Sequence, residues 1–189
     1  MSDKPTYIGI LNAIVNGERG GFESLNAWAS VSPDPDVSGM LKTVALREGE
    51  HAATFEKRLC ELGYSLREKK DPNFSKTMDI VCSELSDSEK FEKLGLLQTV
   101  SEEGEDKLLQ VMADKSIDPQ TGALLGRFIA EERDSGRILR EAYQCAKGKT
   151  DTASDTVTLN QICQQLEKLT EAVSELQGVK KTKVRAVKT

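Results

Sequence analysis

The sequence predicts an all-α protein, in which two similar helical hairpins pack as a four-helix bundle and one further helix follows. Apolar residues recur at intervals of three and four along most of the chain, as on one face of a helix. Only 5% of the 189 residues are aromatic and 30% are charged, a composition more typical of long amphipathic helices than of sheets. The third observation is an internal repeat.

The repeat relates residues 10–63 to residues 94–147 by a shift of 84. Without gaps, nine of the 54 aligned positions are identical, where composition alone gives about three. Each copy therefore carries one Glu on its first helix and one on its second, and both copies have the same loop dipeptide. The identities include Glu18 with Glu102, Glu48 with Glu132, and Asp34 and Pro35 with Asp118 and Pro119.

The first hairpin is predicted from two amphipathic segments and the break between them. Residues 6–30 form the first predicted helix, and the Ser-Pro-Asp-Pro sequence at 32–35 ends it, because proline lacks a donor and restricts the preceding residue. The second predicted helix covers about residues 37–62, and Gly63 is expected to cap it. Its inward face carries Leu41, Val44, Glu48, His51, Phe55 and Leu62.

The second hairpin follows a long crossover at 64–86, which includes a short apolar helix near Met78. Such a connection can run the length of a bundle and return. A capping box formed by Ser86 and Glu89 is expected to start the third helix, which the apolar pattern extends to about residue 115. Asp118 as cap and Pro119 as first helical residue are expected to start the fourth. The predicted four-helix bundle domain spans residues 6–147.

The C-terminal part has a different pattern. Residues 148–156 form a polar linker, residues 157–178 an amphipathic helix with about three heptads of apolar residues, and residues 179–189 a basic tail. The heptad helix needs a partner for its apolar seam, so we expect self-association or docking of a protein partner through 157–178. The tail can contact phosphates, anionic lipid or acidic protein, or act as a solubilising extension.

Charge and cysteine usage limit the class of protein. The net charge is −5, and removing the five basic residues of the tail leaves −10 for the rest, so no specific nucleic-acid binding is expected. The four cysteines form no Cys-x-x-Cys pair and are expected to be reduced thiols of a cytoplasmic protein. No apolar run is long enough for a transmembrane segment.

Four glutamates and the only histidine form a candidate metal site. In carboxylate di-metal bundles, two helices each supply one Glu and the other two each supply Glu-x-x-His, with both groups on one helix face. Glu48 and His51 match this motif, whereas the second copy has Ser135 three residues after Glu132. The candidate ligands are Glu18, Glu48, His51, Glu102 and Glu132.

These residues also have a structural explanation. A single histidine on an apolar face can be a hydrogen-bonded core residue, and the glutamates can pair with arginines. However, Glu48 and Glu132 interrupt apolar faces, and acids facing one interior repel unless a cation, a proton or an arginine compensates them. On the third helix, Glu105 fits the apolar stripe about as well as Glu102, which the repeat favours. The arginines nearest in sequence are Arg19, Arg47, Arg127 and Arg133.

The segment 6–147 resembles the ferritin-like superfamily, in particular bundles of the rubrerythrin and bacterioferritin type. The resemblance rests on the glutamates, the Glu48-x-x-His51 motif, the duplicated hairpin and the long crossover. It implies a ferritin-like four-helix bundle that binds iron, one or two ions per chain, and oxidises Fe(II) with oxygen or peroxide. The chain departs from the family at Ser135, which makes the second Glu-x-x-His motif degenerate.

Two functions follow from this pattern. The first is binding of iron or another divalent metal in the bundle core, with an Fe(II)/peroxide oxidoreductase activity. The alternative is a non-catalytic ferritin-like scaffold that has lost the site, binds no metal and associates through its C-terminal helix. Ser135 is the residue that favours the alternative.

Overall fold

The computed structural model describes residues 5–96 and 114–148, which belong almost entirely to the first of two units, Met1–Ala146 and Lys147–Thr189. All regular secondary structure in these residues is helical, which confirms the all-α prediction for them. The helices are α1 (Ile8–Val31), α2 (Pro35–Glu61), α3 (Phe74–Val81), α4 (Asp87–Leu94) and a long helix at 119–148. Glu102, Glu105, the linker beyond residue 148, the heptad segment 157–178 and the tail 179–189 lie outside the described residues.

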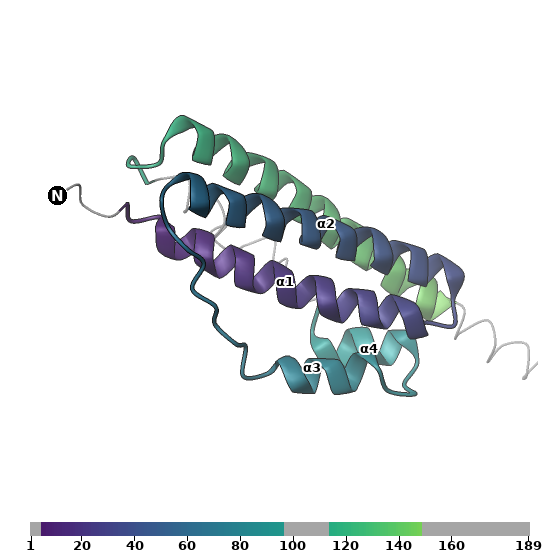
Figure 1. Ribbon diagram of the computed structural model, residues 1–189. Coiled ribbons are helices and arrows are strands. Elements are labelled where there is room, and N and C mark those ends of the chain that lie inside the picture. Colours follow the sequence, from purple (N-terminus) through teal and green to yellow (C-terminus); the bar gives the residue numbers. More distant parts are fainter. Residues whose placement is uncertain (1–4, 97–113, 149–189) are drawn as a thin grey trace, which may run out of the picture. The chain divides into compact units, whose positions relative to one another are not determined.

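The three long helices run side by side and form the body of this unit (Figure 1). α1 and α2 are joined by a tight turn, in which the Asp34 side chain accepts a hydrogen bond from the Asp36 amide and Pro35 starts α2. The predicted break at 32–35 is therefore confirmed, and α2 begins two residues earlier than the apolar pattern indicated. Helix 119–148 lies along α2 and shares apolar contacts with both α1 and α2.

The C-terminal end of α2 has the geometry that the predicted glycine cap requires. Gly63 has φ +80°, in the left-handed region, and its amide donates to the Cys60 carbonyl while the Tyr64 amide donates to the Leu59 carbonyl. This pair of bonds is a Schellman motif, which satisfies carbonyls at the helix end. The chain then runs along α1, where Asn12 and Asn16 accept hydrogen bonds from the amides of Arg67 and Lys69.

The two short helices α3 and α4 cover the side of α1 that faces away from α2 (Figure 1). The ring of Trp28 packs on Phe91 of α4 at 4.6 Å between centroids, and its indole N–H donates to Asp87 at 2.7 Å. The capping box predicted for this helix is present, since Ser86 and Glu89 exchange hydrogen bonds. The aromatic pair and the buried hydrogen bond thus fix α4 to α1.

The prediction of a continuous third helix from Asp87 to about residue 115 is wrong at Gly95. α4 ends at Leu94, because Gly95 adopts a left-handed φ of 64° and caps the helix through a bond from its amide to the Glu92 carbonyl. A glycine can take this conformation at no steric cost, so a position that fits the helical pattern serves here as its end.

The core consists of two apolar clusters, one near each end of the long helices. The first includes Trp28, Leu41, Val44 and Ala142, and the second includes Leu11, Val15, Phe55, Leu59 and Phe128. In sequence, Glu18, Glu48, His51 and Glu132 fall between the members of the two clusters on their respective helices. The candidate site therefore lies at the middle of the bundle, between two apolar layers.

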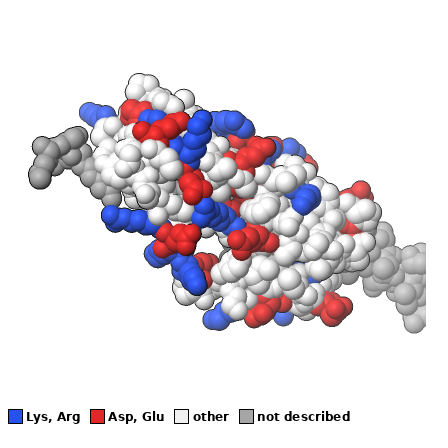
Figure 2. Space-filling view, viewed as in Figure 1, with Lys and Arg blue, Asp and Glu red and all other residues white. Residues whose placement is uncertain are grey.

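The described residues contain no helix that is both long and apolar enough to cross a membrane. In the same residues, Cys60, Cys82 and Cys145 are free thiols. On the face shown in Figure 2, basic and acidic side chains are interspersed rather than gathered by sign.

Candidate metal centre

Three helices contribute side chains to the polar centre of the bundle. Glu18 comes from α1, Glu48 and His51 from α2, and Glu131 and Glu132 from helix 119–148. The i, i+3 spacing of Glu48 and His51 places both on the same face of α2. The structure therefore brings together the ligand atoms of three predicted ligands, Glu18, His51 and Glu132. The Glu48 carboxylate lies beside Gly21 of α1, and Glu102 lies outside the described residues.

His51 lies at the middle of this centre and contacts carboxylates through both ring nitrogens. Its Nδ1 lies 3.0 Å from Glu18 Oε2 and 3.5 Å from Glu132 Oε1, and its Nε2 lies 2.8 Å from Glu131 Oε2. Only 6% of its side chain is exposed. One side of the imidazole thus faces two candidate ligands, and the opposite side is held by a third carboxylate.

Glu132 is left without a full partner in this arrangement. The single hydrogen that Nδ1 can carry is taken by Glu18 at the shorter distance, so Glu132 Oε1 at 3.5 Å retains only electrostatic attraction. Among the described residues, this oxygen is buried and has no hydrogen-bond partner. A buried carboxylate oxygen without a donor is costly, which makes the centre incomplete as a purely hydrogen-bonded core.

The carboxylate of Glu48 lies against the backbone of α1. A Cβ built on Gly21 would lie 1.7 Å from Glu48 Oε2, so only a glycine leaves room for this carboxylate in its observed position. Burial raises the pKa of Glu48 to about 8, and the nearby charges of Glu18 and Glu132 contribute in the same direction. Gly21 therefore helps to place an acid that is protonated at neutral pH in the metal-free protein.

The pKa of His51 is also raised, although burial acts on a histidine in the opposite direction to its effect on a carboxylic acid. Burial disfavours its charged form, but the contacts with the carboxylates of Glu132, Glu18 and Glu131 outweigh burial and raise the pKa of His51 to about 10. Burial also raises the pKa of Glu18, although its hydrogen bond to His51 opposes this. In the metal-free protein, the proton on His51 thus supplies one positive charge, and the proton on Glu48 removes one negative charge from the centre.

The arginines that could have neutralised the predicted ligands are bound elsewhere. Arg19 pairs with Glu56 at 2.7 Å, Arg47 with Asp134 at 3.0 Å, and Arg127 with Glu131 at 2.9 Å. For these three arginines, the structure does not support pairing with Glu18, Glu48 or Glu132. Three of the four nearby arginines are therefore occupied by acids that were not among the predicted ligands.

Glu131 is the residue of the centre that is not among the five predicted ligands, although with Asp134 it forms a Glu-x-x-Asp pair in the sequence. Its carboxylate bridges His51 Nε2 and Arg127 Nε, and the hydrogen bond to His51 lowers its pKa. The available signal was the i, i+4 spacing of Arg127 and Glu131, which is common on exposed helix faces and does not single out a site. Its side chain is 27% exposed, so it lies at the edge of the centre.

Ser135, where the repeat lacks its second histidine, is buried at the interface of α2 and helix 119–148. The Arg47 guanidinium occupies the space beside it: Nη1 donates to Ser135 Oγ and to the Glu131 carbonyl, both at 3.0 Å, and Nη2 donates to Asp134. Ser135 thus faces a cation rather than a carboxylate.

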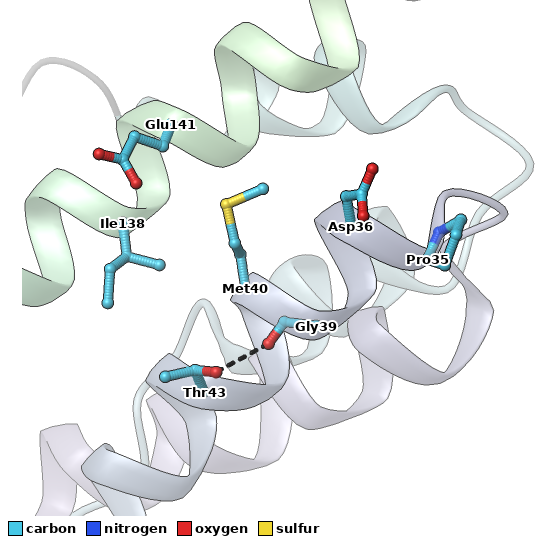
Figure 3. A pocket seen from close by; sticks show the side chains of 7 residues that line it. All are labelled: Pro35, Asp36, Gly39, Met40, Thr43, Ile138 and Glu141. Carbon is cyan, nitrogen blue, oxygen red and sulfur yellow. Dashed lines mark hydrogen bonds between the residues drawn. The ribbon is translucent and has the colours of Figure 1, made fainter.

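A shallow groove of about 520 Å³ lies elsewhere, between the start of α2 and helix 119–148 (Figure 3). None of the predicted ligands lines it. Within it, Thr43 is tied to its own helix by a hydrogen bond to the Gly39 carbonyl. The lining residues are Pro35, Asp36, Gly39, Met40, Thr43, Ile138 and Glu141. The groove is therefore separate from the His51 centre.

The ligand atoms of Glu18, His51 and Glu132 lie within 4.8 Å of one another, close enough to share one metal ion. Carboxylate oxygens together with a neutral imidazole suit first-row divalent metals such as iron, manganese or zinc. Comparisons of the chain with models of protein families, with curated proteins and with solved structures found no match.

Proposed function

We propose that the chain is a ferritin-like carboxylate protein that binds a divalent metal, iron foremost, in the core of its bundle. The proposed ligands are Glu18, Glu48, His51 and Glu132, with Glu102 as the predicted contribution of the segment outside the described residues. The observation that supports the proposal most directly is the convergence of Glu18 and Glu132 on the His51 imidazole, with Glu132 Oε1 buried and without a hydrogen bond.

The residues present fit a metal ion. Metal-binding histidines commonly donate their second ring N–H to a carboxylate, which fixes the tautomer and the ring orientation. His51 has this arrangement, because Nδ1 faces Glu18 and Glu132 while Nε2 is held by Glu131. A metal ion would replace the protons that now neutralise the centre, and it would give Glu132 Oε1 the partner that it lacks.

The surrounding residues suit redox chemistry at such an ion. Bound iron would supply electron transfer to oxygen or peroxide, and this is the oxidoreductase activity that we propose. The chain's own contribution is to orient the ligands and to limit water: Phe128 packs edge-on against the His51 ring at 5.0 Å, and Phe55 packs on Phe128. The hydrogen bond from Nε2 to Glu131 keeps Nδ1 directed at the centre.

The second candidate function is a non-catalytic scaffold of the same fold. It is favoured by the contact between Arg47 and Ser135, which replaces the second imidazole, and by the fact that a protonated His51 already satisfies Glu18 and Glu131. In that case the centre is a structural cluster of hydrogen bonds, and function depends on association through residues 157–178.

Metal analysis distinguishes these functions. The full chain is loaded with Fe(II) under anaerobic conditions, desalted and analysed for iron per chain, beside Glu48→Ala and Glu50→Ala. Glu50 is an exposed glutamate of the same helix and serves as the matched control. We expect iron to be retained by the wild type and the control and lost from Glu48→Ala, and oxygen or peroxide consumption to follow the same order.

Iron in the wild type no higher than in Glu48→Ala would overturn the metal-binding proposal and leave the scaffold. Iron retention without any consumption of oxygen or peroxide would limit the proposal to metal binding.

A further inference from the structure

The two halves of the centre are related by the same shift that relates the two hairpins. Adding 84 to 51 gives 135, and adding 84 to 47 gives 131, so the pair His51 and Glu131 corresponds to the pair Ser135 and Arg47. Both pairs are in contact: His51 Nε2 lies 2.8 Å from Glu131 Oε2, and Arg47 Nη1 lies 3.0 Å from Ser135 Oγ. The sequence repeat is therefore reproduced as a pair of equivalent contacts between α2 and helix 119–148.

The two contacts differ in the sign of the charge at equivalent positions, since Glu131 is an acid and Arg47 a base. In the first half, an imidazole that faces the ligand acids is supported from behind by a carboxylate. In the second half, a hydroxyl stands in the place of the imidazole and a guanidinium in the place of the supporting carboxylate. The first half attracts a metal ion and holds a ligand ready for it, whereas the second half has a fixed positive charge and no imidazole.

We infer that the centre holds one divalent cation, on the His51 side, and that Arg47 is the residue that excludes a second. This inference rests on the proposed function.

Arg47 is well fixed for this role. Its guanidinium binds the Glu131 carbonyl, the Ser135 hydroxyl and the Asp134 carboxylate, and its side chain is 21% exposed. Three directed contacts prevent the charge from swinging away when a cation approaches. The Asp134 carboxylate accepts hydrogen bonds from Arg137 and Arg47 and is therefore already engaged by these arginines.

Ser135 also makes the second half a poorer metal site than the first. It is 3% exposed and its oxygen is used as the acceptor for Arg47. A neutral hydroxyl is a weak ligand compared with an imidazole, and this one is already engaged. The ligand atoms that do lie together, from Glu18, His51 and Glu132, are enough for one ion.

The test is the binding stoichiometry of the full chain, measured by anaerobic titration of the metal-free protein with Co(II), followed both by its visible absorption and by calorimetry. We expect one equivalent per chain. Two equivalents would overturn the inference and leave the proposed function standing, whereas no binding would overturn both.

Variants test the part played by Arg47. The double variant Arg47→Glu with Ser135→His makes the second half a copy of the first, and we expect it to bind two equivalents. Ser135→His alone keeps the guanidinium and is expected to bind one, as is Arg47→Lys, which keeps the charge. The matched control is Arg137→Glu with Ser135→His, because Arg137 is an exposed arginine of the same region.

A second equivalent in the control or in Ser135→His alone would show that Arg47 does not limit the number of ions. One equivalent in a folded Arg47→Glu, Ser135→His double variant would have the same meaning. If that double variant does not fold, the wild-type stoichiometry still decides the inference.

Discussion

Two polar clusters lie between the same long helices, one around Arg58 and one around His51, and they differ in how their charges are matched. Arg58 donates to Thr121, to Asp118 and to Glu61 at 2.9–3.0 Å, and Tyr7 donates to Asp118 at 2.8 Å. The buried Arg58 thus meets two partly exposed carboxylates, and Lys57, 3.5 Å from Glu61, supplies the second positive charge. Hydrogen bonds from Thr121, Tyr7 and Arg58 hold the pKa of Asp118 below its usual range.

The His51 centre has the opposite balance. One imidazole faces Glu18, Glu131 and Glu132, the pKa of Glu48 is raised, and one oxygen of Glu132 is unpartnered. Burial of charge is common to both clusters and therefore does not identify a site. What identifies the candidate site is the excess of acid, because a matched cluster is satisfied by its own members, whereas an excess requires protons or a metal ion.

The largest expected effect is on the pH dependence of stability in the metal-free protein. The folded-state pKa values of Glu48 (about 8) and His51 (about 10) are raised above their unfolded values, so the folded state binds these protons more tightly. Their contribution is complete below the unfolded pKa values and is lost as pH rises through the folded ones. From about pH 5 to about pH 9, we expect the free energy of unfolding to fall by several kcal/mol, since a shift of one pKa unit corresponds to about 1.4 kcal/mol.

Urea denaturation in the presence of a chelator measures this fall. Glu48→Gln should flatten the curve, because the amide needs no proton, whereas the exposed Glu50→Gln should leave it unchanged. A wild-type stability that is constant or that rises over this range would contradict the charge imbalance described for the centre.

The next effect concerns the matched cluster. Arg58→Met should lower the free energy of unfolding by about 2–3 kcal/mol, because it leaves Asp118 without its cation and Glu61 with Lys57 alone, while both carboxylates keep some contact with water. Metal binding at the other cluster should be unaffected. Arg137→Met is the control, since its ion pairs are exposed and little change in stability is expected.

A loss of metal binding in Arg58→Met at temperatures where the variant is folded would show that the two clusters are coupled. The Arg58 cluster could then not be described as purely structural, because it would also affect metal binding at the His51 centre.

The smallest expected effect concerns two glycines of α1. Gly17→Ala adds a methyl group that meets nothing within 4 Å and should stabilise the helix by about 1 kcal/mol. Gly21→Ala places its methyl group where Glu48 Oε2 lies, and that flexible carboxylate should move away rather than the helix. We expect Gly21→Ala to fold well but to weaken metal binding about tenfold, or about 1.4 kcal/mol.

Calorimetric titration of both alanine variants measures this difference in affinity. Equal affinity of Gly17→Ala and Gly21→Ala would mean that the observed position of the Glu48 carboxylate is not needed for binding.

Most of the helix ends were predictable, because the residues that set them are local. Asp34 and Pro35 at the start of α2 and the capping box of α4 act through bonds that span three residues or fewer. The interruption of apolar faces by Glu48 and Glu132 was visible for the same reason. Gly95 was the exception, since a glycine fits both the interior and the end of a helix, and the residue type alone does not determine that its φ is left-handed.

The side-chain contacts of the centre depend on the relative position of α2 and helix 119–148. Short sequence patterns do not specify this position. The apolar pattern places Glu18, His51 and Glu132 on inward faces, but only the packed helices bring Glu131 to His51 and Arg47 to Ser135. The close approach of Gly21 to Glu48 also requires α1 and α2 to be packed. Sequence patterns repeat every few residues and specify which face is buried, whereas partners on different helices are chosen by the register and spacing of the whole bundle.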